Sequence, residues 1–161
     1  MQHLFFSEDM QLMLEQLSNA RVFLYKRVHM RDRNNESRVR WELVHRFTQF
    51  PTDLAEITQY PYIFSPDFTM YLDVDRKNKQ FLIRDSRSQE VKVEIPDTIM
   101  SCKEEPIKTA ASRFTWASND SLRIINSVGI ERRIALVENK NTKEINFKEE
   151  KYCVVQLFDK L

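Results

Sequence analysis

Short apolar runs separated by polar stretches make up the hydrophobic pattern of the chain. Twice the pattern begins with similar letters, at Phe6-Ser7-Glu8-Asp9 and, 58 residues later, at Phe64-Ser65-Pro66-Asp67. Each start leads into an apolar run, a polar turn and a second run rich in Val, Ile, Phe and Tyr. Because this order is typical of an antiparallel hairpin, the sequence predicts a repeated β-structure.

The strands within a unit differ in their pattern. The middle strands, RVFLY at 21–25 and QFLI at 80–83, are apolar on both sides, which indicates that both faces of the sheet are covered. The closing strands alternate apolar and polar residues, as expected where a sheet edge meets water. In the second unit the apolar positions are Val91, Val93 and Ile95. In the first unit the alternation predicts one shared face for Val39, Trp41, Leu43, His45 and Phe47.

A third unit repeats the hairpins without the Phe-Ser-x-Asp start. Its strands are expected at 113–117, 122–126 and 130–137, and the tail predicts a partial hairpin at 143–158. The blade-like units then cover about 2–48, 58–96 and 98–138. Small sheets stacked face to face satisfy both strand patterns. The predicted fold class is therefore all-β: a β-propeller-like array of antiparallel four-stranded blades, about three blades plus a partial one, in a single domain over 1–161.

One segment also fits a helix. Over 7–17, Ser7 is a suitable N-cap, and Met10, Met13, Leu14 and Leu17 have helical spacing. The parallel with 64–75, which is rich in β-formers, favours a strand at both places.

Composition limits the kind of protein. The chain has 161 residues, a formal charge of +1 and a single glycine, Gly129, so its turns must use Asn, Asp, Ser and Pro. Two widely spaced cysteines, Cys102 and Cys153, indicate reduced thiols in a cytoplasmic protein. The sequence shows no secretory signal and no long apolar run, so no membrane association is expected.

These patterns resemble the WD-repeat β-propeller family at low specificity over most of residues 2–137. Phe64-Ser65-Pro66-Asp67 is similar to the family's stretch between the innermost strand and the second strand. Arg84-Asp85 lies where the family has its Trp-Asp dipeptide, with only the Asp kept, and Tyr25-Lys26 and Ile125-Asn126 lie there in the other units. The chain has no Trp-Asp and no Gly-His dipeptide, so the family's hydrogen-bond network is not carried over.

The resemblance implies a non-catalytic protein-interaction scaffold. A closed ring takes about four to eight blades, so we expect the chain to be part of a longer propeller protein or to pair with another chain. An open stack is expected to leave apolar blade faces exposed at both ends. The expected partners are proteins of unknown identity, and further blades of the same parent chain are an alternative.

No catalytic, phosphate-binding or metal-binding motif is present in the sequence, and we expect no enzymatic activity, no cofactor and no metal. Asp73 and Asp75 alternate on one strand and would share a face, as metal ligands do. The RKNKQ segment that follows is mainly cationic, so solvation of the strand end is the favoured interpretation.

The segment from Arg21 to Arg46 is the most basic. It holds eight Lys or Arg against three acids, with Tyr25 and Trp41 interleaved. Cations with aromatic neighbours suit RNA or an acidic protein, whereas a solvated edge strand is the alternative interpretation. Tyr60 and Tyr62 flank Pro61 and suit a peptide contact or core packing. The candidate partner-binding residues are Arg31, Arg33, Arg38, Arg40, Trp41, Tyr60 and Tyr62.

Two other functions remain open at this point. One is a regulatory or substrate-positioning domain of a larger enzyme, with catalysis elsewhere in the parent chain. The other is an RNA- or ribonucleoprotein-binding module that uses the basic segment at 21–46.

Overall fold

The computed structural model is all-β over the residues that it describes. These residues are 3–18, 21–47, 63–75, 77–78, 80–100, 105–109, 112–129, 131–138 and 145–149. Among them, no helix is long and apolar enough to cross a membrane.

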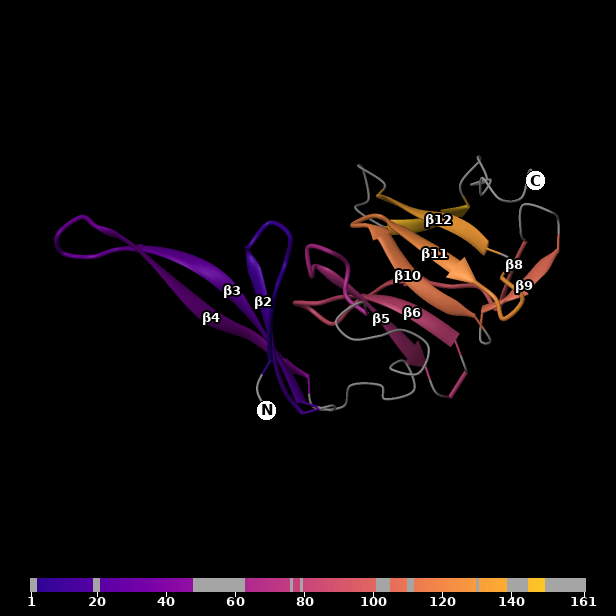
Figure 1. Cartoon of the computed structure of the whole chain (residues 1–161), viewed down its shortest axis with the longest axis horizontal. Coiled ribbons are helices and arrows are strands. Elements are labelled where there is room, and N and C mark those ends of the chain that lie inside the picture. Colours follow the sequence, from indigo (N-terminus) through magenta and orange to yellow (C-terminus); the bar gives the residue numbers. More distant parts are fainter. Residues whose placement is uncertain are drawn as a thin grey trace.

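Three antiparallel sheets follow one another along the chain, and in each the strand order is the chain order (Figure 1). The first sheet contains β1 (His3–Phe6), β2 (Leu12–Ser18), β3 (Arg21–Arg31) and β4 (Ser37–Phe47). The second contains β5 (Met70–Asp75), β6 (Gln80–Asp85) and β7 (Val91–Glu94). The third contains β10 (Arg113–Ser118), β11 (Ser121–Ile125), β12 (Glu131–Glu138) and β13 (Ile145–Glu149).

This arrangement is that of a β-propeller-like array, because each sheet is a meander and successive sheets share a core. A single bridge from Phe64 to Tyr71 gives the second sheet a short first strand. A small hairpin of β8 (Thr98–Met100) and β9 (Pro106–Lys108) lies between the second and third sheets in the chain. The predicted fold class is confirmed.

Aromatic side chains hold the first and second sheets together. Phe47 on β4 has its ring centroid 5.7 Å from that of Phe64 and 5.2 Å from that of Tyr71. The second and third sheets meet at Phe81 and Phe114, whose ring centroids lie 4.4 Å apart. All five side chains are buried in one hydrophobic cluster, so the three sheets form a single core.

The segment after Ser7 is a strand. β2 pairs with both β1 and β3, and its residues Leu12 and Leu14 are fully buried. The interpretation of 7–17 as a helix is therefore excluded, and the strand that the repeat favoured is confirmed.

The tail differs from the expected separate hairpin. β13, at 145–149, pairs with β12 and becomes the fourth strand of the third sheet. The other part of the expected hairpin, at 150–158, lies outside the described residues.

The face predicted for β4 is wrong at its C-terminal end. Leu43 pairs with Tyr25, and His45 pairs with the preceding residue, Leu24, because a β-bulge shifts the register. Neighbouring strand residues point to opposite faces, so Leu43 is exposed while His45 turns inward with buried Phe47. Bulges also bend a strand, and this one lies within the part of β3 that also pairs with β2.

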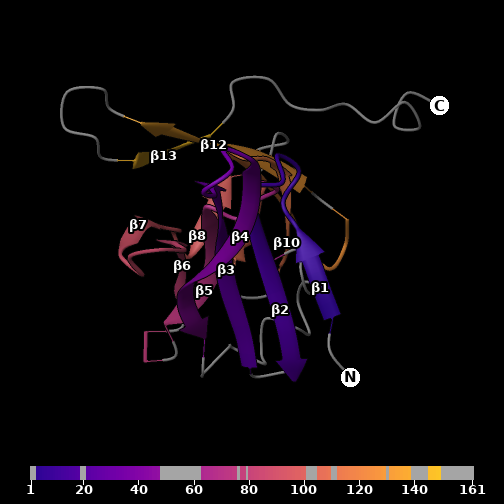
Figure 2. The same ribbon diagram turned by 90° about the vertical axis from the view of Figure 1, so that its left-hand side faces the viewer.

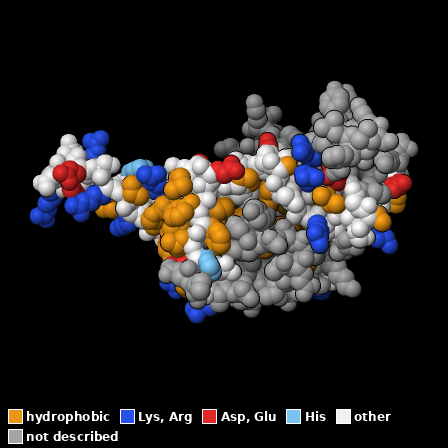
Figure 3. All heavy atoms as spheres, in the orientation of Figure 1, with side chains coloured by type: hydrophobic (Ala, Val, Ile, Leu, Met, Phe, Trp, Pro, Cys, Tyr) orange, Lys and Arg blue, Asp and Glu red, His pale blue; other side chains and the backbone are white. Residues whose placement is uncertain are grey.

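The two ends of the stack differ in polarity. On the outer face of the first sheet, Leu4, Phe6 and Val39 are each 45–49% exposed, and hydrophobic side chains gather there in Figure 3. The described outer face of the third sheet is polar and includes an ion pair between Arg123 and Glu131. The expectation of an apolar face at both ends therefore holds for the first sheet only.

His45 should make stability depend on pH. Burial lowers the pKa of its imidazole below the ordinary value of 6.5, so the unfolded chain takes up a proton more readily than the folded one. The stabilising contribution is complete above about pH 6.5 and is lost as the pH falls through the folded pKa. The urea concentration at the midpoint of unfolding should thus be lower at about pH 5.5 than at about pH 7.5. His45→Gln should flatten this change, and an equal change in the variant would contradict the assignment.

Candidate functional site

The corner between β1 and β2 is built around one buried serine. The Ser7 hydroxyl donates to Asp9 Oδ1 at 2.6 Å and accepts the backbone N–H of Leu12 at 3.0 Å. Met10 takes a left-handed backbone conformation, with φ of 59°. The hydrogen bond from Ser7 also lowers the pKa of the Asp9 carboxyl. Asp9 thus replaces a glycine-rich turn by hydrogen-bonding its local backbone, as the low glycine content predicts.

The second corner repeats this geometry residue by residue. The Ser65 hydroxyl donates to Asp67 Oδ1 at 2.8 Å and accepts the backbone N–H of Met70 at 3.1 Å. Phe68 is left-handed with φ of 60°. The Phe-Ser-x-Asp stretch therefore marks one structural corner in both sheets.

A third corner fills the same role with a different sequence. Between β10 and β11, the Ser118 hydroxyl donates to Asp120 Oδ1 at 2.7 Å. Asn119 and Asp120 alone separate the two strands, so this turn is three residues shorter than the others. The third unit thus has its own corner serine, which the sequence comparison missed because Ala117 stands where the other units have Phe.

Hydrogen bonds join the three corners in a row. The backbone N–H of Glu8 donates to the Pro66 carbonyl at 3.1 Å, and the backbone N–H of Asp67 donates to Asn119 Oδ1 at 2.9 Å. These contacts bring the first strands of all three sheets together at one place.

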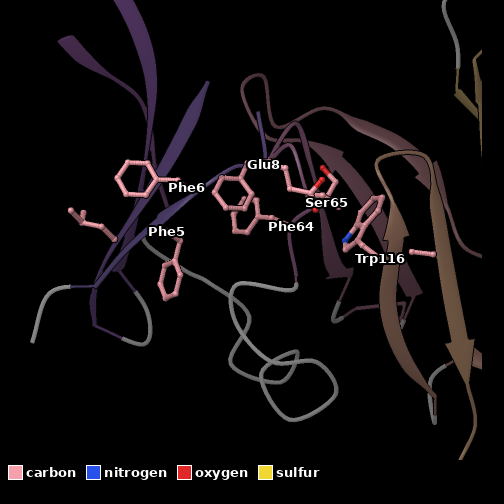
Figure 4. A pocket seen from close by; sticks show the side chains of 10 residues that line it. Phe5, Phe6, Glu8, Phe64, Ser65 and Trp116 are labelled. Atoms are coloured by element: carbon pink, nitrogen blue, oxygen red, sulfur yellow. The ribbon is translucent and has the colours of Figure 1, made fainter. Parts of the chain in front are cut away.

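A hollow of about 600 Å³ lies at this place, between the first strands (Figure 4). Trp116 forms part of its wall, with Nε1 donating to the Ile63 carbonyl at 2.9 Å. Glu8 is exposed and is the one charged side chain among the lining residues. The hollow is lined by Leu4, Phe5, Phe6, Glu8, Phe64, Ser65, Pro66, Phe68, Trp116 and Ala117.

This lining suits binding through apolar contact. Aromatic rings give large contact areas, and a few polar groups at the mouth orient a ligand. Its one carboxylate, Glu8, would favour a cationic group beside the apolar part of a ligand. The sequence signal for the hollow was the Phe-Ser-x-Asp repeat itself, since the first strands and corners supply all ten lining residues.

The aspartates weighed as metal ligands have other partners. Asp73 forms an ion pair with Arg84 at 2.7 Å. Asp75 accepts the backbone N–H of Lys77 at 3.0 Å and a side-chain N–H of Asn78 at 2.8 Å. Within the described part of the chain, no group of three or more His, Cys, Asp or Glu is placed to hold a metal ion.

None of the predicted partner-binding residues that the structure describes lines the hollow, although the Trp41 ring centroid lies 5.8 Å from that of Phe6 in its wall. Arg31, Arg38, Arg40 and Trp41 lie on the β3–β4 hairpin and Arg33 in its turn (Figure 1). Tyr60 and Tyr62 lie outside the described residues. The structure thus brings five of the seven together on one projecting arm.

No family model matches the sequence, and no curated protein matches it. Two solved structures are similar in shape. One is KlHsv2 with loop 6CD replaced by a Gly-Ser linker, at 10% identity and a TM-score of 0.47 over 92% of this chain and 43% of that one. The other is Hsv2 of Kluyvelomyces marxianus, at 9% identity and a TM-score of 0.41 over 92% of this chain and 44% of that one. The chain spans less than half the length of either structure.

Proposed function

We propose that this chain is a WD-repeat-like, non-catalytic scaffold of the cytoplasm that binds a protein partner through the hollow between its first strands. The observation that supports the proposal is the convergence of three corners on one apolar, aromatic-lined space of about 600 Å³. Its size is that of an ordinary ligand pocket. A protruding apolar side chain of a partner, with a neighbouring Lys or Arg near Glu8, would match it.

We also propose that the chain works as part of a longer propeller. Support comes from the outer face of the first sheet, across which β1 to β4 lie side by side (Figure 2). Apolar side chains are exposed on this face. Leu17 and Leu43 are each 38% exposed on this face. A further sheet packed there would remove this surface from water, as between the sheets already present.

Filling the hollow tests its role. Ala117 is exposed and lines the hollow, so Ala117→Trp should occupy the space while leaving the fold intact. A photo-crosslinker, p-benzoylphenylalanine, placed at Leu4 should capture a protein from an extract of the source cells. We expect Ala117→Trp to weaken capture roughly 30-fold, the loss that follows when a hot-spot contact of about 2 kcal/mol is removed.

The matched control is Val128→Trp, at a position that is 78% exposed in the β11–β12 turn. Capture should survive in this control, after nuclease treatment, and at about 1 M salt, where the Debye length is only about 3 Å. Capture that is unchanged in Ala117→Trp, or that disappears at high salt, would contradict the proposal.

A further inference from the structure

The β3–β4 hairpin continues well beyond the rest of its sheet. β2 pairs with β3 only as far as Lys26, whereas the pairing of β3 with β4 runs on to Arg31 and Ser37. Residues 27–41 therefore form a two-stranded arm that projects from the body (Figure 1). Arg27 and Trp41 at its base are half-buried, whereas His29, Met30, Arg31 and residues 33–40 are exposed to a partner.

The cross-strand register sorts the charges of the arm onto two different faces. On β3, Arg27, His29 and Arg31 alternate, so they share one face. Their partners on β4 are Trp41, Val39 and Ser37, and this face of the arm carries no acidic residue.

The opposite face of the arm is neutralised in part. Arg38 forms an ion pair with Asp32 at 3.2 Å, and Arg40 lies 3.8 Å from Glu42. Asp32 also accepts backbone N–H groups of the turn, which holds its carboxylate in place. Among the residues that the structure describes, the cations of the arm without a carboxylate partner are thus on the Arg27–Arg31 face and at the tip, where Arg33 is exposed.

We propose that the Arg27–Arg31 face binds single-stranded nucleic acid. Alternate strand residues lie about 6.8 Å apart, so the cations of this face form a line that a nucleic-acid backbone can follow. Arginine suits phosphate because its planar fork donates two hydrogen bonds at once. Trp41, half-buried beside Arg27, offers a surface on which a base stacks. An acidic protein would use the cations but would have no use for a stacking surface.

This site adjoins the hollow at Phe6, whose ring centroid lies 5.8 Å from that of Trp41. It goes beyond the proposed scaffold because it uses the cations of the arm, none of which lines the hollow. The five residues from Arg27 to Arg31 span about 14 Å, so this face with the tip can contact a few nucleotides at once. Contacts to about three phosphates would give a slope of log K against log salt of about −2 for a single strand.

Fluorescence anisotropy with labelled mixed-sequence RNA and DNA strands of about ten nucleotides tests the proposal on the full chain. We expect binding with this salt slope, and comparison of the two strands tells which nucleic acid is preferred. Binding should also quench tryptophan fluorescence, and Trp41→Phe should abolish the quench, because the remaining Trp116 is in the wall of the hollow.

Two double variants with the same change in net charge test whether nucleic acid binds to the Arg27–Arg31 face and tip or to the opposite face of the arm. Arg31→Gln with Arg33→Gln should weaken binding about tenfold or more, whereas Arg38→Gln with Arg40→Gln, with the same change in net charge, should have a much smaller effect. All four side chains are exposed, so both variants should fold. Equal losses in the two variants, no measurable binding, or equal binding of polyglutamate without a quench would each overturn the proposal.

Discussion

Replacing Phe64 with alanine is expected to lower the free energy of unfolding by about 3–5 kcal/mol, the usual cost of removing a buried phenylalanine. Phe64 is 2% exposed and its ring centroid lies 5.5–5.8 Å from those of Phe47, Phe68 and Tyr71. The variant loses both apolar burial and ring contacts across the interface of two sheets. Since a domain has a net stability of only about 5–15 kcal/mol, this change should leave the first sheet poorly attached.

Urea unfolding followed by tryptophan fluorescence measures the loss. Trp41 reports on the first sheet and Trp116 on the third, so Trp41→Phe in the same background separates the two signals. Phe6→Ala is the matched control, because Phe6 is 45% exposed and its removal should cost less than about 1 kcal/mol. A loss of less than about 1 kcal/mol for Phe64→Ala would mean that the aromatic cluster does not join the sheets.

The strand pattern predicted β6 well because burial on two faces leaves a clear trace: the consecutive residues Phe81, Leu82 and Ile83 are all buried. For β3 the same expectation was wrong, since Val22 and Leu24 are buried on the inner face but Phe23 and Tyr25 are only half-buried on the outer face. Strand edges, turns and the repeated corner were also readable, since Ser and Asp at fixed spacing can make the local hydrogen bonds that glycine-poor turns need.

Register was what the sequence could not show. An extra residue near Val44 turns Leu43 and His45 to opposite faces, and the alternating pattern is the same with or without it. Register also decides which arginines are free of carboxylates. Arg38 and Arg40 look equivalent to Arg31 in the sequence, but the first two lie beside Asp32 and Glu42.

The third unit was harder for a different reason. Its corner has two residues between strands and lacks the leading Phe, so Ser118 passed as an ordinary turn residue. The placement of β13 depended on a pairing across 139–144 that no local pattern specifies, and the tail was therefore assigned to a hairpin of its own. The hollow could not be predicted from any single unit, because it forms only where the three corners lie in contact.

Removing the corner hydroxyl by Ser65→Ala should cost about 1–3 kcal/mol, the cost of leaving a buried polar group without its partner. Ser65 is fully buried, and its Oγ accepts the N–H of Met70, which would lose this acceptor. Asp67 keeps its bonds from the N–H and hydroxyl of Thr69, so the corner should persist in a weakened form. Chemical denaturation measures the loss.

Ser118→Ala is the matched comparison, because the same serine-to-aspartate bond there joins a half-buried hydroxyl to an exposed carboxylate. Water can take the place of the lost hydroxyl at exposed Asp120, while the buried Ser121 hydroxyl loses its 2.8 Å contact with Ser118. We therefore expect a smaller cost than at Ser65, about 1 kcal/mol or less. Ser7→Ala, at the other buried corner, should resemble Ser65→Ala because Leu12 loses its acceptor in the same way. Similar small losses at all three corners would show that the turns are held by their backbone alone. A large loss at Ser7 and Ser65 together with a small one at Ser118 would identify the buried serine as the feature that the repeated Phe-Ser-x-Asp stretch maintains.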